Sequence, residues 1–209
     1  MRETTTIVRR GLFICAAAAL ALGLGGCGGR AFTGPVEVTR FVAEAPQGLG
    51  SGTIALRFSE ELTSEAAREA FRASVGNELA LIGYTLVGEG AEAGQIAAIE
   101  TSRTPVETSE PGRPVNVGVG GGTGGMGVGV GIDLGARDAG PRVISRLAVR
   151  ISDRSGKTLW EGRAAHPISI DSAYAPLAAS ARVLARGLFR EFPGNNGETV
   201  EISVDTLQD

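Results

Sequence analysis

The sequence predicts an α+β domain of two layers, in which two helices pack on one face of a largely antiparallel sheet. Segments that alternate apolar and polar residues, the period of strands, occur on both sides of two stretches with helical period. Each of these two stretches has one apolar face and needs a sheet to cover. The 209 residues, 43% hydrophobic and 21% charged, suit one globular domain with a short additional segment.

Two strands and a helix are expected first. Residues 36–41 and 52–58 alternate apolar and polar side chains, as half-buried strands do. Beyond them the apolar residues recur at every third or fourth position, at Phe71, Val75, Leu79 and Ile82. This spacing predicts a helix that Thr63 or Ser64 caps at its N-terminus and that Gly83 ends.

Two short strands and an insertion follow. Strands are expected over residues 84–87 and 95–101, and three prolines predict a loop over residues 105–114. Glycine is then concentrated, because residues 112–135 hold 11 of the 32 glycines in the chain. Valine and isoleucine alternate with other residues, mostly glycine, on both sides of the cluster. The insertion is therefore expected to be either a long β-hairpin or a disordered loop.

The second half repeats the order strand, strand, helix, strand. Residues 143–151 and 157–165 predict a hairpin, with apolar side chains inward and Arg146, Ala148 and Arg150 outward. A helix is expected over residues 174–189, with Pro176 in its first turn and a solvated face formed by Arg182, Arg186 and Arg190. A last strand over residues 199–204 completes a domain that spans residues 36–204, followed by a tail, 205–209.

The N-terminus resembles a bacterial lipoprotein signal. Arg9 and Arg10 precede 16 apolar or small residues, 11–26, fewer than the ~20 that span a membrane. The stretch ends in an aliphatic residue, two small residues and a cysteine, the pattern of a lipobox: Leu24, Gly25, Gly26 and Cys27. We therefore expect residues 1–26 to be a signal peptide and Cys27 to be lipidated. The alternatives are an ordinary signal peptide followed by a chance cysteine, or a short buried helix.

Lipidation predicts anchoring in the bacterial cell envelope. Several acyl chains, at about 0.8 kcal/mol per buried CH₂, hold a protein stably on a membrane. Gly28 stands where an aspartate would retain a lipoprotein in the inner membrane, so we expect outer-membrane anchoring on the periplasmic face, through a tether of residues 27–35. Loss of residues 1–26 changes the formal net charge from −3 to −5, and we expect no nucleic-acid partner for such an acidic domain.

Two glycine motifs suggest nucleotide binding but lack its context. Residues 120–125 match the dinucleotide pattern G-x-G-x-x-G, yet alternating glycines follow where a helix is required. Gly156, Lys157 and Thr158 resemble the end of a phosphate-binding loop, but the earlier glycine of that motif is replaced by Ile151. We expect no nucleotide, and a hairpin turn at residues 153–156.

Catalytic and metal-binding patterns are also weak. His166 is the only histidine, and no G-x-S-x-G element accompanies it. Besides Cys27, the only cysteine is Cys15 in the expected signal peptide, so a Cys/His zinc site is not expected. We expect a non-enzymatic protein without catalytic residues, cofactor or metal.

Three segments of the domain are similar to the bacterial lipoproteins of the domain-of-unknown-function 4136 family: residues 38–41, residues 156–164 together with Asp153, and residues 189–197. The lipobox and the glycine-rich middle fit the same family, and the resemblance covers roughly residues 36–204. It implies an envelope location and an α+β domain, and it implies no reaction.

The expected role is that of an interaction or structural module with an envelope protein as partner. The alternative is an auxiliary subunit that binds a lipid or another apolar ligand for an envelope transport system. An apolar pocket lined by Phe71, Leu79 and Leu188 would favour that alternative, and a filled core would disfavour it. A hydrolase that uses His166 is the third and weakest hypothesis.

Overall fold

The computed structural model describes residues 31–88, 90–106, 116–117, 132–133 and 141–208. Its elements follow the predicted order. The first half contains β1 (Val36–Val42), β2 (Gly52–Phe58), α2 (Glu65–Ile82), β3 (Tyr84–Val87) and β4 (Gln95–Val106). The insertion contains β5 (Asn116–Val117) and β6 (Ile132–Asp133), and the second half contains β7 (Arg142–Asp153), β8 (Thr158–Ser169), α3 (Leu177–Phe189), β9 (Thr199–Ile202) and the 3₁₀ helix η1 (Val204–Leu207).

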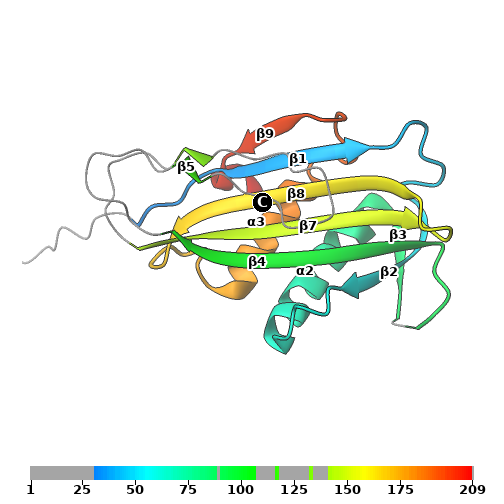
Figure 1. Cartoon of the computed structure of the whole chain (residues 1–209), viewed down its shortest axis with the longest axis horizontal. Helices are drawn as coiled ribbons and strands as arrows, with labels where there is room; N and C mark the ends of the chain where they lie inside the picture. The colour runs from blue at the N-terminus through cyan, green and yellow to red at the C-terminus, as the bar shows by residue number, and fades with distance from the viewer. Residues whose placement is uncertain (1–30, 89, 107–115, 118–131, 134–140, 209) are drawn as a thin grey trace, which may run out of the picture. The chain divides into compact units, whose positions relative to one another are not determined.

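Seven strands form one sheet in the order β3-β2-β4-β7-β8-β1-β9 (Figure 1). The hairpin of β7 and β8 lies at its centre, and β4, β1 and β9 extend the sheet through antiparallel pairs. β3 and β4 both run parallel to β2, and α2 forms the crossover between β2 and β3. The predicted α+β fold with a largely antiparallel sheet is confirmed.

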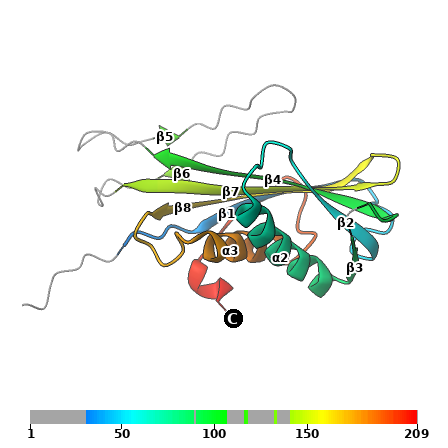
Figure 2. The ribbon, with the colours of Figure 1, turned by 90° about the horizontal axis from the view of Figure 1, so that it is seen from below.

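Both helices lie on the same side of this sheet (Figure 2). The predicted stripe of α2 faces the strands: Phe71, Val75 and Leu79 are buried, and Ile82 is half-buried. Ser64 caps α2 by accepting a hydrogen bond from the Ala67 N–H, and Gly83 ends it in the left-handed region at φ 125°. The two helices and the sheet share one hydrophobic core, and no helix of the described residues lies on the opposite face of the sheet.

Two element boundaries differ from the predicted ones for reasons of proline chemistry. β4 continues to Val106, so Pro105 lies in a strand and not in a loop. β2 pairs with β4 only as far as Ile99, and a proline is tolerated in a strand whose outer edge is free. α3 begins at Leu177 and not at residue 174, since Pro176 disfavours helical geometry at the residue before it.

The C-terminal residues belong to the domain. Instead of a tail, η1 places Val204 and Leu207 in the core. Two of the arginines expected on a solvated face hold this segment: Arg186 donates to the Leu207 carbonyl at 2.7 Å and Arg190 to the Thr206 hydroxyl at 2.8 Å.

The start of the domain also lies earlier than expected. The Phe32 carbonyl accepts a hydrogen bond from Ser169, and the Gly34 N–H donates to the Pro167 carbonyl, both at 2.9 Å. Residues 32–35 of the expected tether are therefore attached to the end of β8.

The glycine-rich insertion is described at four residues. Asn116 pairs with Asp133 and Val117 with Ile132 in an antiparallel ladder. This pairing agrees with the hairpin prediction at these positions, and the other residues of the insertion lie outside the described ranges.

Candidate functional site

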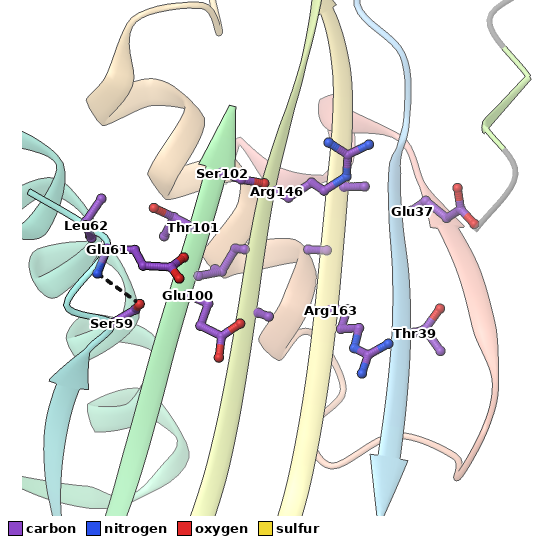
Figure 3. Close-up of a pocket in the computed structure, with 14 residues that line it drawn as sticks. Glu37, Thr39, Ser59, Glu61, Leu62, Glu100, Thr101, Ser102, Arg146 and Arg163 are labelled. Atoms are coloured by element: carbon purple, nitrogen blue, oxygen red, sulfur yellow. Dashed lines mark hydrogen bonds between the residues drawn. The ribbon is translucent and has the colours of Figure 1, made fainter. Parts of the chain in front are cut away.

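A hollow of about 420 Å³ lies on the helix-free face of the sheet, and we call it the outer groove (Figure 3). Two rows of side chains across β4, β7, β8 and β1 form it. One row contains Glu100, Ala148, Arg163 and Thr39, and the next contains Ser102, Arg146, Ala165 and Glu37. The small alanines in the middle leave space between larger polar side chains on either side.

The rim of the groove carries charges of both signs. Glu37 lies on one side, Glu61 and Glu100 lie on the other, and Arg146 and Arg163 lie between them (Figure 3). Glu61 comes from the loop after β2, and its side chain reaches towards β4. Neither Glu61 nor Glu100 forms an ion pair with another described residue. Within the described ranges, both carboxylates are therefore without an ionic partner.

Arg163 belongs to a small ionic network at the groove. Its guanidinium donates to one oxygen of Glu161 at 2.6 Å, and Arg150 donates to the other at 3.1 Å. Burial by itself raises the pKa of Glu161, but the hydrogen bonds from Arg150 and Arg163 outweigh it and hold the pKa below its ordinary value. Glu161 therefore stays ionised and fixes the position of Arg163.

The pKa of Glu37 is shifted in the opposite direction from that of Glu161. Burial raises its pKa, and the negative charge of Glu201, directly across on β9, adds to the effect. Together these side chains suit recognition of a charged partner through ion pairs and hydrogen bonds. Across the described ranges, no cluster of His, Cys, Asp and Glu has the arrangement of a metal site.

His166 lies away from the outer groove. Its side chain is fully buried on the helix side of β8, edge-on to Tyr174 at 5.9 Å between ring centroids. Neither ring nitrogen has a hydrogen-bond partner in the described part of the chain, and burial lowers the pKa of His166 to about 4. The nearby backbone of Gly34 raises the pKa of His166 by less than burial lowers it, and its contact with the ring does not have the geometry of a hydrogen bond. The histidine is therefore neutral at pH 7, and it lies on the opposite face of the sheet from the groove.

The segments that carry the family resemblance meet in a packed cluster at the C-terminus of α3. Arg40 is 5% exposed and donates to the carbonyls of Gly187, Leu188 and Arg190 at 3.0, 3.0 and 2.7 Å. Burial lowers its pKa, while the charges of Glu191 and Glu198 act in the opposite direction. Arg40 thus serves the carbonyls that a helix leaves without partners at its end.

Trp160 connects the other two segments. Its indole N–H donates to the Pro193 carbonyl at 2.9 Å, and its ring stacks on Phe189 at 5.4 Å between centroids. Gly162, two residues on, is required because a Cβ there would collide with the Trp160 ring. Arg40, Trp160 and Gly162 therefore hold the fold together and do not line the outer groove. Thr39, Arg163 and Ala164 of the same segments do line it.

The segment that resembles a phosphate-binding loop is a hairpin turn, as predicted. One carboxylate oxygen of Asp153 accepts hydrogen bonds from the Ser155 hydroxyl, the Ser155 N–H and the Lys157 N–H. These bonds, that from the Ser155 hydroxyl foremost, lower the pKa of Asp153. β8 follows directly, so no helix N-terminus faces the loop.

The core is filled where an apolar ligand pocket was considered. Leu79 and Leu188 are 0% exposed and pack in the hydrophobic core. Phe71 lines a separate cavity of about 160 Å³ beside β4.

The expected lipidation site lies outside the described residues. This applies to Leu24, Gly25, Gly26 and Cys27, and also to the glycine motif at residues 120–125. None of the helices within the described ranges is long and apolar enough to cross a membrane.

Sequence reasoning identified two residues in the middle of the groove and missed the others. The alternation of β7 correctly placed Arg146 and Ala148 on the outward face. Glu37, Glu100 and Arg163 have the same outward parity on their own strands, but the sequence does not say which strands are neighbours.

No sequence profile of a known protein family matches the chain, and no curated protein matches it. Several solved structures resemble it. A PDZ domain protein from Parabacteroides distasonis has 17% identity and a TM-score of 0.48, and the similarity covers 90% of this chain and 42% of that protein.

Two further structures are similar over most of their own length. A PelC dodecamer from Paraburkholderia phytofirmans has 11% identity and a TM-score of 0.38, with 72% of this chain and 91% of that chain covered. A minor lipoprotein from Acinetobacter baumannii has 12% identity and a TM-score of 0.32, with 67% and 92% covered. With TM-scores below 0.5, none of these similarities bears on the function of this chain.

Proposed function

We propose that this protein is an outer-membrane lipoprotein, anchored by Cys27 on the periplasmic face, that works as a non-enzymatic interaction module. The helix-free face of the sheet is the surface that binds an envelope protein. The main support for this proposal is the outer groove. There Glu61 and Glu100 have no ionic partner among the described residues, and Glu161 holds Arg163 in place. Fixed charges on an exposed sheet face are suited to protein recognition.

The location rests on the sequence. The lipobox at residues 24–27 and the similarity to the lipoproteins of the domain-of-unknown-function 4136 family both support a lipid anchor in the envelope. Attachment of residues 32–35 to β8 would leave a short connection between Cys27 and the domain, which would hold the domain close to the membrane surface.

A second candidate function is binding of a small apolar ligand for an envelope transport system. The cavity of about 160 Å³ beside Phe71 favours it. A cavity of ~150 Å³ holds a molecule the size of benzene, so this one is too small for an acyl chain. The interaction module is therefore the better-supported function.

Metabolic labelling with palmitate tests the anchor. The wild-type chain should incorporate label, and Cys27→Ala should abolish it because the acceptor thiol is lost. Cys15→Ala is the matched control, since this cysteine lies inside the expected signal peptide, and it should label normally. Persistent labelling of Cys27→Ala would overturn the assignment.

Photo-crosslinking in intact cells tests the interaction surface. A crosslinking residue at Arg163, in the outer groove, should capture a discrete protein partner. The same residue at Arg182, exposed on α3 on the other side of the sheet, serves as the control. Equal capture from both positions, or from neither, would refute the proposed surface.

A further inference from the structure

Among the described strands, β4 has a free edge over its second half. On one side it pairs with β7 along its whole length, from Gln95 to Val106. On the other side its pairing with β2 ends at Ile99, and in the described part of the chain no strand continues that side. Side chains on this stretch are largely exposed.

The backbone groups at this edge can be assigned. Ser59 N–H donates to the Ile99 carbonyl at 3.1 Å, so Ile99 directs its backbone polar groups away from β7. Alternate residues of a strand share this direction, and Thr101 and Arg103 therefore present two N–H and two C=O groups at the free edge. Pro105, next in the alternation, has no N–H to offer.

A cavity of about 160 Å³ opens beside the same residues on the helix side. Leu62, Phe71 and Leu177 give it an apolar wall, and Ser145 and Ser180 also line it. These two serines are 4% and 2% exposed, and neither hydroxyl has a hydrogen-bond partner among the described residues. A buried hydroxyl without a partner is costly, so the cavity is suited to a group with an apolar body and a polar tip.

The cavity and the outer groove meet at the free edge. Leu62, Thr101 and Ser102 line both of them. On the groove side of this junction lie Glu61 and Glu100, which have no ion pair with another described residue. The edge therefore has an apolar cavity on one face of the sheet and unpaired negative charge on the other.

We propose that an extended segment of a protein partner adds to the sheet as a strand along Thr101–Arg103. One tyrosine of the segment enters the cavity, where its ring contacts Phe71 and its hydroxyl reaches the buried serines. The residues on either side of the tyrosine point to the opposite face, as alternation in a strand requires, and are basic because Glu61 and Glu100 lie there. This inference rests on the proposed interaction module and names its partner chemistry.

Peptide binding to the full-length protein in detergent tests the inference. The probe is a fluorescent peptide with the core Thr-Lys-Tyr-Lys-Thr, and its binding is followed by fluorescence anisotropy. Glu100→Lys should weaken binding about five- to tenfold, because an attraction becomes a repulsion. The same variant should gain affinity for the peptide with Glu in place of both Lys. Glu92→Lys, an equal charge change at an exposed loop position, should leave both affinities unchanged.

Two further variants separate the edge from the cavity. Arg103→Pro removes an edge N–H and should abolish binding, while Pro105 shows that this edge accepts proline. Ala67→Met places a larger side chain in the cavity wall and should weaken the tyrosine peptide more than a peptide with Ala in its place. An unchanged unfolding midpoint verifies that each variant is folded.

Several outcomes would overturn the proposal. The proposal is wrong if the probe does not bind, or if it binds wild type and Arg103→Pro equally well. It is also wrong if Glu100→Lys gains no affinity for the peptide with Glu in place of both Lys. Self-association that Arg103→Pro abolishes would identify a second copy of the chain as the occupant instead. If palmitate labelling and crosslinking from Arg163 succeed while the peptide fails, this inference is wrong and the proposed function stands.

Discussion

The Arg40→Met substitution tests whether the motif residues are structural. Helix α3 leaves its last four carbonyls without partners inside the helix. The N–H groups of Arg190 and Phe192 serve the carbonyls of Arg186 and Phe189, and Arg40 serves those of Gly187 and Leu188. Methionine fills similar space but donates no hydrogen bond.

The expected loss of stability follows from this count of acceptors. Arg40 serves three carbonyls, the third being that of Arg190, and each one left buried without a donor costs ~1–3 kcal/mol. Removal of a buried guanidinium relieves part of its desolvation cost. We expect a net loss of about 3 kcal/mol in the free energy of unfolding. The corresponding fall in Tm is about 6–12 °C for a domain of this size.

Urea unfolding followed by tryptophan fluorescence measures this loss. Trp160 is the only tryptophan, is fully buried and belongs to the same cluster, so its emission reports directly on it. Arg57→Met is the matched control, because Arg57 is exposed on strand β2. A loss below about 1 kcal/mol, or one equal to that of Arg57→Met, would refute the helix-capping role of Arg40.

Two other predictions concern stability. Gly76→Ala should add about 1 kcal/mol to the free energy of unfolding, since its Cβ would lie 3.5 Å from Leu86 in ordinary contact. Gly162→Ala should remove ~1–3 kcal/mol, since its Cβ would lie 2.7 Å from Leu188. Urea titration measures both changes, and a change of the opposite sign in either variant would contradict the prediction for that variant. The pKa of His166 is about 4 in the folded chain and 6.5 unfolded, so the unfolded state binds more protons between these values. Stability should therefore fall by about 2 kcal/mol from pH 7 to pH 5, and a His166→Leu variant that loses as much would exclude this cause.

The periodic elements of the fold could be read from the sequence because each is decided locally. Alternation in β7 and β8 and the helical spacing of Phe71, Val75 and Leu79 reflect which face of an element is buried. The predicted ends of elements were less accurate where a neighbouring element determines how far a strand continues. Pro105 is accepted in β4 because β2 ends before it, and no pattern within β4 records where β2 ends.

The candidate site depends on strand order more than on any motif. Glu37 and Glu100 are 63 positions apart, and they share a groove only because β1 and β4 flank the central hairpin. The motifs that attracted attention in the sequence, around Arg40 and Trp160, are instead the packing around the end of α3. A pattern that the fold needs for stability can therefore be more conspicuous than the residues of a binding surface.

By itself, the sequence determined the fold class, the order of the elements and the expectation of a lipid anchor at Cys27. These depend on residue types and spacings within short segments, where hydrophobic periodicity and local chemistry act. Only the tertiary structure decided that His166 is buried, that charges from four strands and a loop form one groove and that β4 has a free edge. Those features arise from long-range pairing of strands, and the free energy that selects one strand order is shared by the whole core.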